Sequence, residues 1–544
     1  MKRFVFRCIE SIENAPLGLG SLVVTFLALI LARLMIENAL ALFEERSFFF
    51  LFFEFSHTFL FFLCSFLILI PIVRYAGAEN IKKAINILLF GFLIILTPPI
   101  IDRWIMGTGN YWSFYEFDGL FGLLQRFFTL FGDTPDIGIT YGVRVEVVLV
   151  TLALGIYAYL KSRLLKQALL VALLTYTTLF ILGTFPSWVT LAVLTFQKGL
   201  LAINSNDVAA LFLSPEQILG RDLIDFRSVL NFKMSLVYAL LVSGLASLLL
   251  FRQYPRYFSA LWHNARFPQL IYHAGLLLLG MILAWYFSNS HIRFEFFHIV
   301  AILTLLIAVE SAWLASVVAN DLHDTAIDAI TNTGRPLIKQ TIPPHLYRLF
   351  GILFFVTSLF FAALVSFSAL LILLCYQALA WLYSASPLRL KKYPLVATCI
   401  AACAGILILI AGFVAVAPTH NIEALPLSLL SYLFVAYLLA LPIKDFKDIA
   451  GDKHDHIYTI PVLLGATLAK QVIGSLTFLL FAISPLVLHI RPLFLPALFF
   501  GGLSFFALQK GTPIESSFFA FRKLPRIILS ITLFYGLTIA LFLF

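Results

Sequence analysis

Long apolar runs, separated by short polar segments, recur along the whole chain. The runs at 48–73 and 296–318 are typical, because each consists mainly of aliphatic and aromatic residues. A membrane-spanning helix needs about 20 predominantly apolar residues, so each run predicts one span. The pattern therefore predicts an all-α polytopic membrane protein, with about six or seven spans in its N-terminal part and nine in its C-terminal part.

The predicted spans fall into two groups on either side of a basic, aromatic segment at 252–267. In the N-terminal group they lie near 18–36, 48–74, 83–101, 145–160, 165–184, 186–200 and 233–251. In the C-terminal group they lie near 268–287, 294–319, 346–365, 367–383, 395–416, 425–442, 461–487, 492–508 and 525–543. We expect an N-terminal module at 1–251, an amphipathic interfacial connector at 252–267 and a nine-helix bundle at 268–544.

Composition supports the membrane interpretation and excludes one class of partner. Hydrophobic residues make up 61% of the chain and charged residues 12%, whereas soluble domains have roughly 45–50% and 25%. The formal charge of +9 comes from Lys and Arg in short loops between apolar runs. Because they form no basic domain, we expect no nucleic-acid partner. The five cysteines have no zinc-site spacing.

Loop charge predicts the orientation of the nine-helix bundle. Its even-numbered loops hold the basic residues Arg335, Lys339, Arg389, Lys391, Lys392, Lys444, Lys447, Lys453, Lys510, Arg522 and Lys523. The opposite loops hold only Arg293 and Arg491. Cytoplasmic loops carry the excess of Lys and Arg. We therefore expect a multi-pass protein of the cell membrane whose even-numbered loops face the cytoplasm.

Two Asp-rich segments with the same spacing follow the second and sixth of these spans. They contain Asn320, Asp321, Asp324 and Asp328, and Lys444, Asp445, Asp448 and Asp452. Both read Asp-x2-Asp-x3-Asp, and positions i, i+3 and i+7 of a helix fall within about 60° of one another. Each segment is therefore predicted to form one stripe of carboxylates.

Such stripes at the ends of spans favour a metal site. Like charges repel one another and are costly near a membrane, and hard oxygen ligands select Mg²⁺ over softer metals. Mg²⁺ takes only one or two carboxylates and completes its shell with water and substrate phosphate. Two carboxylate stripes are thus suited to hold Mg²⁺ ions that bind a diphosphate between them. A solvated acidic loop is the alternative, which the matching spacing disfavours.

A third cluster follows the fourth span of the bundle. The segment 383–392 holds the phenol of Tyr383 together with Arg389, Lys391 and Lys392. Guanidinium and ammonium groups recognise phosphate oxygens. The segment is predicted to supply cations to a bound diphosphate, and ordinary loop charge is the alternative.

In these residues the chain resembles the UbiA-type superfamily of intramembrane prenyltransferases. Residues 320–328 match its NDxxDxxxD motif and are followed by an Arg-Pro pair at 335–336. Residues 383–391 match its Tyr-Ser-x-x-Pro-x-Arg-x-Lys pattern, and 444–452 match its second Asp motif. The resemblance covers roughly 262–544, and residues 1–250 lie outside it.

The resemblance implies a Mg²⁺-dependent transfer of an isoprenyl group from its diphosphate to an aromatic or lipid acceptor. The implied metal-binding residues are Asn320, Asp321, Asp324, Asp328, Asp445, Asp448 and Asp452. The implied diphosphate-binding residues are Arg335, Arg389, Lys391 and Lys444. The implied catalytic residues are Asp324, Asp448, Lys444 and Tyr383, of which Tyr383 could face an allylic cation.

Other interpretations stay open at this point. A polyprenyl-phosphate phosphoribosyl transferase of the same superfamily is disfavoured by the residues at 331–336, which lack its His-Pro-x-Lys pattern. A cation-dependent transporter or lipid scaffold is disfavoured because transporter sites usually lie near the bilayer midplane. His323, and also His454 and His456, are expected to be solvated, with metal or acceptor contact as the alternative.

No residue pattern in the N-terminal module indicates a particular reaction. Charged residues flank or line its first long loop: Asp102, Arg103, Asp118, Asp133, Asp136, Arg144 and Glu146. They are expected to anchor helix ends, with a second site as the alternative. A docking or substrate-delivery role of the module is a further alternative.

Overall fold

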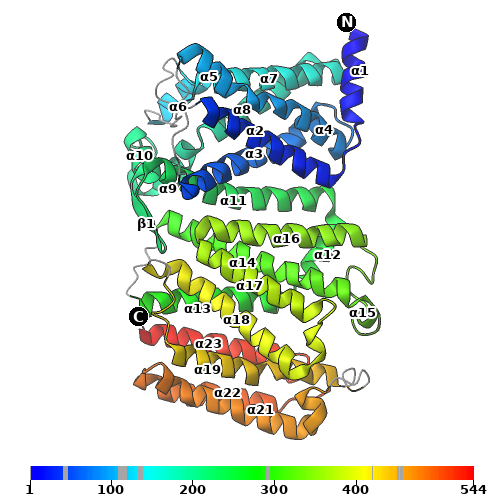
Figure 1. The fold of residues 1–544 in the computed structure, drawn as a ribbon, viewed down its shortest axis with the longest axis vertical. Helices are drawn as coiled ribbons and strands as arrows, with labels where there is room; N and C mark the ends of the chain where they lie inside the picture. Colours follow the sequence, from blue (N-terminus) through cyan, green and yellow to red (C-terminus); the bar gives the residue numbers. More distant parts are fainter. Residues whose placement is uncertain are drawn as a thin grey trace. The chain divides into compact units, whose positions relative to one another are not determined.

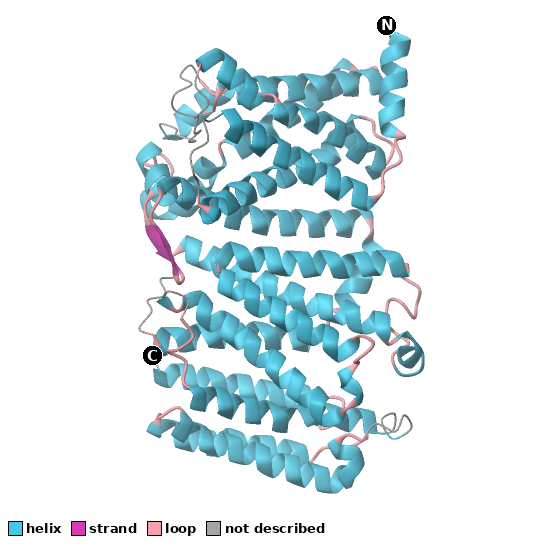
Figure 2. Ribbon diagram, viewed as in Figure 1, coloured by secondary structure: helices cyan, strands magenta, loops and turns pink. Residues whose placement is uncertain are grey.

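The computed structural model is almost entirely helical, as Figures 1 and 2 show. It describes residues 2–40, 47–107, 119–132, 139–288, 295–418, 421–449, 453 and 458–543. Fifteen helical segments among them are long and apolar enough to span a membrane. The prediction of an all-α polytopic membrane protein is therefore confirmed.

The chain divides into two compact units. Unit 1 comprises Met1–Glu216 and Asp222–Arg252, and unit 2 comprises Gln217–Arg221 and Gln253–Phe544. The division falls near the predicted connector, whose residues form the short helix α12 (Pro255–Asn264). Its predicted interfacial position stays a prediction.

Unit 1 holds six of the candidate spans in its described residues. These are α2 (Leu19–Leu40), α3 (Phe48–Ala76), a stretch made of α4 (Ile81–Gly91), η1 (Phe92–Leu96) and α5 (Pro98–Met106), α7 (Tyr141–Ser162), α8 (Leu165–Gly183) and α11 (Phe226–Gln253). The shorter elements are α1 (Lys2–Glu13), α6 (Gly119–Phe128), α9 (Phe185–Lys198), α10 (Ser205–Leu213), β1 (Glu216–Ile218) and β2 (Arg221–Leu223). The predicted span at 186–200 corresponds to α9, which has 14 residues and is too short for a span.

Polar side chains define where the helices of unit 1 begin. Ser47 accepts a hydrogen bond from the Phe50 amide at 3.2 Å and caps α3. Asn80 caps α4 in the same way, through the Lys83 amide at 3.0 Å. These caps satisfy amides that have no partner within a helix.

The charged residues around the first long loop have separate roles. Asp102 is buried and accepts a hydrogen bond from the Gly142 amide at 2.7 Å, so it ties α5 to the start of α7. Arg144 donates from Nε to the Ile139 carbonyl at 3.0 Å. Both are anchors of helix ends. Asp118, Asp133 and Asp136 lie outside the described residues.

Unit 2 contains nine long helices in its described residues, and this confirms the predicted nine-helix bundle. They are α13 (Phe267–Phe287), α14 (Phe296–His323), α16 (Pro344–Val365), α17 (Phe367–Ser384), α18 (Pro394–Val416), α19 (Leu427–Ala440), α21 (Ile460–Val487), α22 (Phe494–Gln509) and α23 (Leu524–Leu543). Shorter elements are α15 (Thr325–Thr331), η2 (Leu390–Lys392), η4 (Leu441–Asp448) and η5 (Arg491–Leu493). The end of α14 and the end of α19 lie at the same end of this unit (Figure 1).

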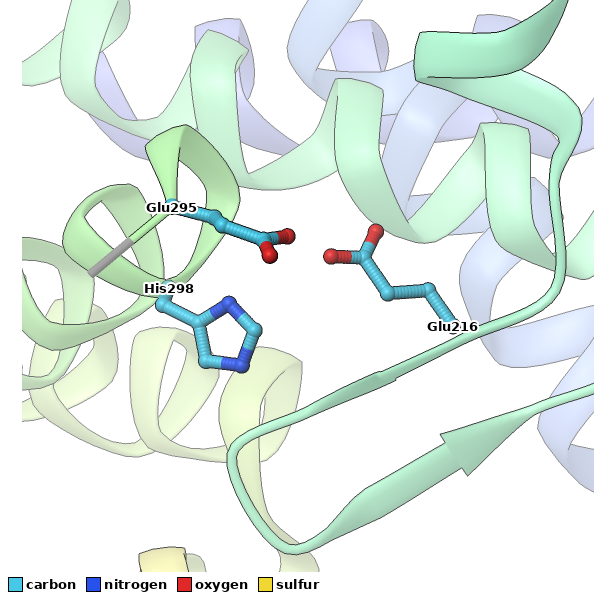
Figure 3. A group of neighbouring side chains, drawn as sticks. All are labelled: Glu216, Glu295 and His298. Atoms are coloured by element: carbon cyan, nitrogen blue, oxygen red, sulfur yellow. The ribbon is translucent and has the colours of Figure 1, made fainter. Parts of the chain in front are cut away.

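Three acidic or basic side chains near the unit boundary are shown together in Figure 3. Glu216 begins β1 and belongs to unit 1, where Lys233 Nζ lies 2.7 Å from its carboxylate. Glu295 directly precedes α14 and His298 lies in its first turn, both in unit 2.

Two glycines let α13 and α18 approach each other at backbone distance. A Cβ atom at Gly280 would lie 1.9 Å from the Leu409 carbonyl oxygen, and one at Gly412 would lie 2.0 Å from the Leu277 carbonyl oxygen. Small residues at such crossings drive helix association in membranes, where apolar burial between helices gains little over lipid contact. The two helices therefore pack backbone against backbone at these two glycines.

We expect Gly412→Ala to destabilise unit 2 by roughly 1–3 kcal/mol, because the added methyl group collides with backbone that cannot rotate away. The matched control is Gly536→Ala on α23, where an added Cβ meets nothing within 4 Å. Thermal unfolding of both variants in detergent measures the difference. An unchanged transition in Gly412→Ala would contradict the close packing of α13 and α18.

Candidate functional site

The first Asp-rich segment does not lie on one continuous helix. α14 ends at His323, Asp324 follows with φ −107° and ψ 11°, and α15 begins at Thr325. The predicted single carboxylate stripe on one helix is therefore wrong for this segment. The break occurs because Asp324 turns the chain at the junction, so that Asp321 and Asp328 approach from two helices.

Asp321 is the most enclosed carboxylate of the segment, with its side chain 1% exposed. Its Oδ2 accepts hydrogen bonds from Asn264 Nδ2 at 2.7 Å and from the Tyr347 hydroxyl at 2.8 Å. Its Oδ1 accepts from Arg266 Nη2 at 3.2 Å and is in close contact with Arg335. Two cations and two neutral donors thus compensate one buried charge, as burial of an ionised carboxylate requires.

Asp324 is paired with the third predicted cluster. Its Oδ1 accepts from Arg389 Nη2 at 2.7 Å, and its Oδ2 contacts Lys391 Nζ. Beside it, Asn320 Oδ1 accepts from Ser384 Oγ at 3.2 Å and from Lys391 Nζ at 3.5 Å. The end of α14 and the loop after α17 therefore form one site.

Asp328 completes the group from α15. Its Oδ1 accepts from Asn332 Nδ2 at 3.1 Å, and its Oδ2 lies 2.5 Å from Arg335 Nη1. This second contact is an ion pair without hydrogen-bond geometry, because among the described residues Asp328 Oδ2 has no hydrogen-bond partner. Arg335 bridges Asp321 and Asp328, and so it joins α14 to α15.

Burial changes the proton affinity of the charged groups outside the spans. It raises the pKa of Asp328, against the opposing effect of Arg335. It lowers the pKa of Lys391, against the hydrogen bond from Lys391 to Asp324. It also lowers the pKa of Arg266, which Asp321 opposes. In each case desolvation disfavours the charged form and the partner charge restores it.

Two of the arginines are held in an uncommon backbone conformation. Arg266 has φ 57° and Arg389 has φ 42°, and both lie in the left-handed region that L-residues rarely adopt. The cost is of order 1–2 kcal/mol per residue. Because each arginine contacts one of the motif carboxylates, Asp321 and Asp324, the strain coincides with the site.

The second Asp-rich segment is described only in part. Lys444 and Asp445 lie in the 3₁₀ helix η4. The buried Ile443 and Phe446 of this helix belong to one apolar cluster with residues of α21, α22 and α23. Nothing is described of the Asp448 side chain, and Asp452, His454 and His456 lie outside the described residues. The predicted pairing of the two segments across one metal site therefore stays a prediction.

Sequence reasoning missed three residues that hold Asp321. Asn264 and Arg266 belong to the segment predicted only as a connector, and Tyr347 begins α16. A second unexpected group is Glu310 on α14, whose Oε2 is buried without a hydrogen-bond partner among the described residues. In the sequence, the only signal for Glu310 is that it is an ionisable residue inside an apolar run.

His323 and Tyr383 have simpler surroundings. His323 Nδ1 lies 2.8 Å from the Ala319 carbonyl, and its ring meets Trp381 edge to face, so it serves as a helix-end residue. Tyr383 is half-buried in the last turn of α17, directly before Ser384. Its predicted catalytic role stays a prediction.

Comparison with known proteins identifies the domain that contains this site. The model of the "UbiA prenyltransferase family" matches residues 276–520, a range that includes both Asp-rich segments. We refer to residues 276–520 as the UbiA domain, after the family whose model they match. The predicted resemblance is confirmed for this UbiA domain, and unit 1 lies outside the match.

Two curated relatives resemble part of the UbiA domain. Both are named digeranylgeranylglyceryl phosphate synthase. The protein of Methanopyrus kandleri is 28% identical over 168 residues, which is 31% of this chain and 59% of that protein. The protein of Thermococcus sibiricus is 25% identical over 173 residues, or 31% of this chain and 57% of that protein. The chain thus spans under two thirds of the length of these relatives.

Solved structures of similar proteins cover about half of the chain. A UbiA homologue from Archaeoglobus fulgidus, described as bound to GPP and Mg²⁺, is 19% identical with a TM-score of 0.39 and covers 52% of this chain and 98% of its own. A UbiA homologue from Aeropyrum pernix is 16% identical with a TM-score of 0.38 and covers 50% and 97%.

The hydrogen bonds to Asp321 generate a prediction about stability. We expect Tyr347→Phe to destabilise unit 2 by roughly 1.5–3 kcal/mol, because it removes a donor from a buried carboxylate. Thermal unfolding in detergent measures the effect. Tyr393→Phe is the matched control, since Tyr393 is 59% exposed. Equal transitions in the two variants would show that the Tyr347 hydroxyl does not support Asp321.

Proposed function

We propose that the UbiA domain transfers an isoprenyl group from an isoprenyl diphosphate to a lipid acceptor within the membrane, with Mg²⁺ as its cofactor. The observation that carries this proposal is the convergence of Asn320, Asp324 and Asp328 with three cations. Arg335, Arg389 and Lys391 lie against these oxygen ligands at one end of the unit. Oxygen ligands beside guanidinium and ammonium groups are what a metal-bound diphosphate requires.

One buried atom supports a ligand in this place. Arg389 Nε has no hydrogen-bond partner among the described residues. A buried guanidinium N–H without an acceptor suits a phosphate oxygen. The donor set, which consists of carboxylate and amide oxygens, fits Mg²⁺ rather than a softer metal.

The residues divide into those that hold the site and those that face its ligands. Asp321 is bound by four protein donors, so we assign it to positioning Arg335 and the end of α14, with contact to Mg²⁺ only through water. Asn320, Asp324 and Asp328 are the ligands proposed from the first segment. Lys444, Asp445, Asp448 and Asp452 are those proposed from the second, with Lys444 directed to the diphosphate.

The chemistry is substitution at an allylic carbon. The bond between this carbon and the diphosphate oxygen breaks, the diphosphate leaves, and an acceptor oxygen or carbon forms the new bond and loses its proton. When bound, Mg²⁺ would stabilise the charge of the leaving diphosphate. Arg335, Arg389 and Lys391 stabilise the same charge from fixed positions, and Tyr383 is proposed to face the allylic cation.

A lipid acceptor is favoured over an aromatic one by the relatives. Two proteins that resemble residues of this domain are named digeranylgeranylglyceryl phosphate synthase, a name that describes a lipid product. We further propose that this site faces the cytoplasm from the cell membrane, because cytoplasmic loops carry the excess of Lys and Arg.

Asp324→Ala and Asp448→Ala should each abolish diphosphate release by the purified full chain. The assay contains Mg²⁺ and geranylgeranyl diphosphate, with membrane lipids or aromatic acids as acceptors in separate reactions. The control is Asp222→Ala, an exposed residue of β2 in unit 1. Diphosphate release at the wild-type rate in both motif variants would contradict the assigned site. Transfer to aromatic acids alone would contradict the proposed lipid acceptor.

Removal of divalent cations provides a separate test of the cofactor. Treatment with EDTA should stop diphosphate release, and added Mg²⁺ should restore it, because the carboxylates and the diphosphate then share their charge with the metal. Binding of a non-hydrolysable isoprenyl diphosphate analogue should also weaken without Mg²⁺. Full activity of the metal-free chain would contradict the proposed role of Mg²⁺.

A further inference from the structure

Unit 1 encloses a cavity of about 310 Å³ whose lining includes residues from all six of its long helical segments. The volume is at the lower end of the range of ligand sites in proteins. Six ionisable residues line it: Arg33, Glu37, Glu54, His57, Glu146 and Arg227. Ionisable side chains are costly within membrane-spanning helices, so several around one cavity mark a functional site.

The ionisable residues gather toward one end of the helices. Arg227 is the second residue of α11, and Glu37 lies three residues before the end of α2. His57, the deepest along α3, lies nine residues after its start, which is about 14 Å at 1.5 Å per residue. Deeper in the cavity, the lining is apolar and includes Leu69 and Leu154. The cavity thus has a charged mouth and an apolar floor.

The charged mouth lies away from the basic ends of the helices. Basic residues flank the other ends of α3, α4, α7, α8 and α11, namely Arg74, Lys82, Lys83, Lys161, Lys166 and Arg252. Cytoplasmic ends carry such an excess of Lys and Arg. The mouth is therefore expected to lie in the half of the membrane that faces away from the cytoplasm.

Contacts within the unit hold the charged groups in place. Arg33 Nη1 donates to the Ile95 carbonyl at 2.6 Å and lies 3.9 Å from Glu146 Oε2. His57 Nδ1 lies 2.8 Å from Asn231 Oδ1. Arg33 and Glu146 are each only 13% exposed. Five helical segments thus contribute to a site in which both signs of charge occur: two guanidiniums and three carboxylates.

We propose that this cavity binds a zwitterionic amphiphile, whose head carries both a phosphate and an ammonium group and whose chain enters the apolar floor. The guanidiniums of Arg33 and Arg227 suit the phosphate, and the carboxylates of Glu37 and Glu54 suit the ammonium. A purely anionic head would be repelled by the three carboxylates of the lining, whereas a zwitterionic head offers an opposite charge to both the guanidiniums and the carboxylates. A phospholipid of the outer leaflet with an ethanolamine head has this chemistry.

Binding to the purified full chain tests the proposal. The probes are short-chain phosphatidylethanolamine, the matching phosphatidylglycerol and an uncharged maltoside of equal chain length, each titrated in a detergent that does not compete. We expect saturable binding of the zwitterion alone. Thr58→Trp, which fills the cavity, should abolish this binding, whereas Leu51→Trp, an exposed residue of the same helix outside the cavity lining, should not.

A charge variant tests the head group separately. Arg227→Gln should weaken the binding of phosphatidylethanolamine about tenfold or more, the loss expected for one charge-assisted hydrogen bond. Arg252→Gln is the matched control, because Arg252 is exposed at the opposite end of the same helix. Circular dichroism and thermal unfolding identify variants that retain the native fold.

Three results would overturn the proposal. The first is equal binding of phosphatidylglycerol or of the maltoside. The second is undiminished binding in folded Thr58→Trp. The third is equal affinity in Arg227→Gln and Arg252→Gln, which also decides the matter when Thr58→Trp fails to fold. Prenyl transfer is not part of these measurements, so the activity of the UbiA domain does not affect their outcome.

Discussion

The buried charge of Asp321 is the constraint on which the arrangement of unit 2 depends. A carboxylate at the end of a membrane-spanning helix requires compensation from every side. It receives this from α12, from the residue before α13, from α16 and from the loop after α15. One charge therefore ties the end of α14 to two separate stretches of the chain, 264–266 and 335–347. Arg335 also contacts Asp328, and so it links the same charge to α15.

The apolar runs predicted the bundle closely, because membrane-spanning helices satisfy their backbone within each segment and need little information from elsewhere. The motifs likewise predicted which polar residues meet: Asn320 and Asp324 do contact Arg389 and Lys391. The prediction of one carboxylate stripe was wrong at Asp324. Helical periodicity assumes a continuous helix, and it carries no information about a turn that depends on tertiary contacts. Asn264, Arg266 and Tyr347 were missed for a related reason, because no local pattern connects them to Asp321.

Unit 1 illustrates the limit of local patterns more strongly. Along the sequence, Arg33, His57 and Glu146 are isolated charges in apolar runs, and each resembles a helix-end anchor when considered alone. Their common cavity emerges only when α2, α3 and α7 pack together. By contrast, Asp102 is such an anchor, because the contact that holds it is a hydrogen bond from a backbone amide. Arg33 contacts a backbone carbonyl as well, but it also lies 3.9 Å from the carboxylate of Glu146.

The ion pairs of Asp324 have a thermodynamic consequence for the proposed reaction. Arg389 and Lys391 now contact the carboxylate that would bind the metal, although they are also the groups that would bind the phosphate. If both ligands bind as proposed, metal and diphosphate would each release a partner of the other, so each would raise the affinity for the second by the same factor. Without them, the carboxylate of Asp324 is held between two cations. The ion-pair network would thus couple the binding of the proposed cofactor to that of the proposed substrate.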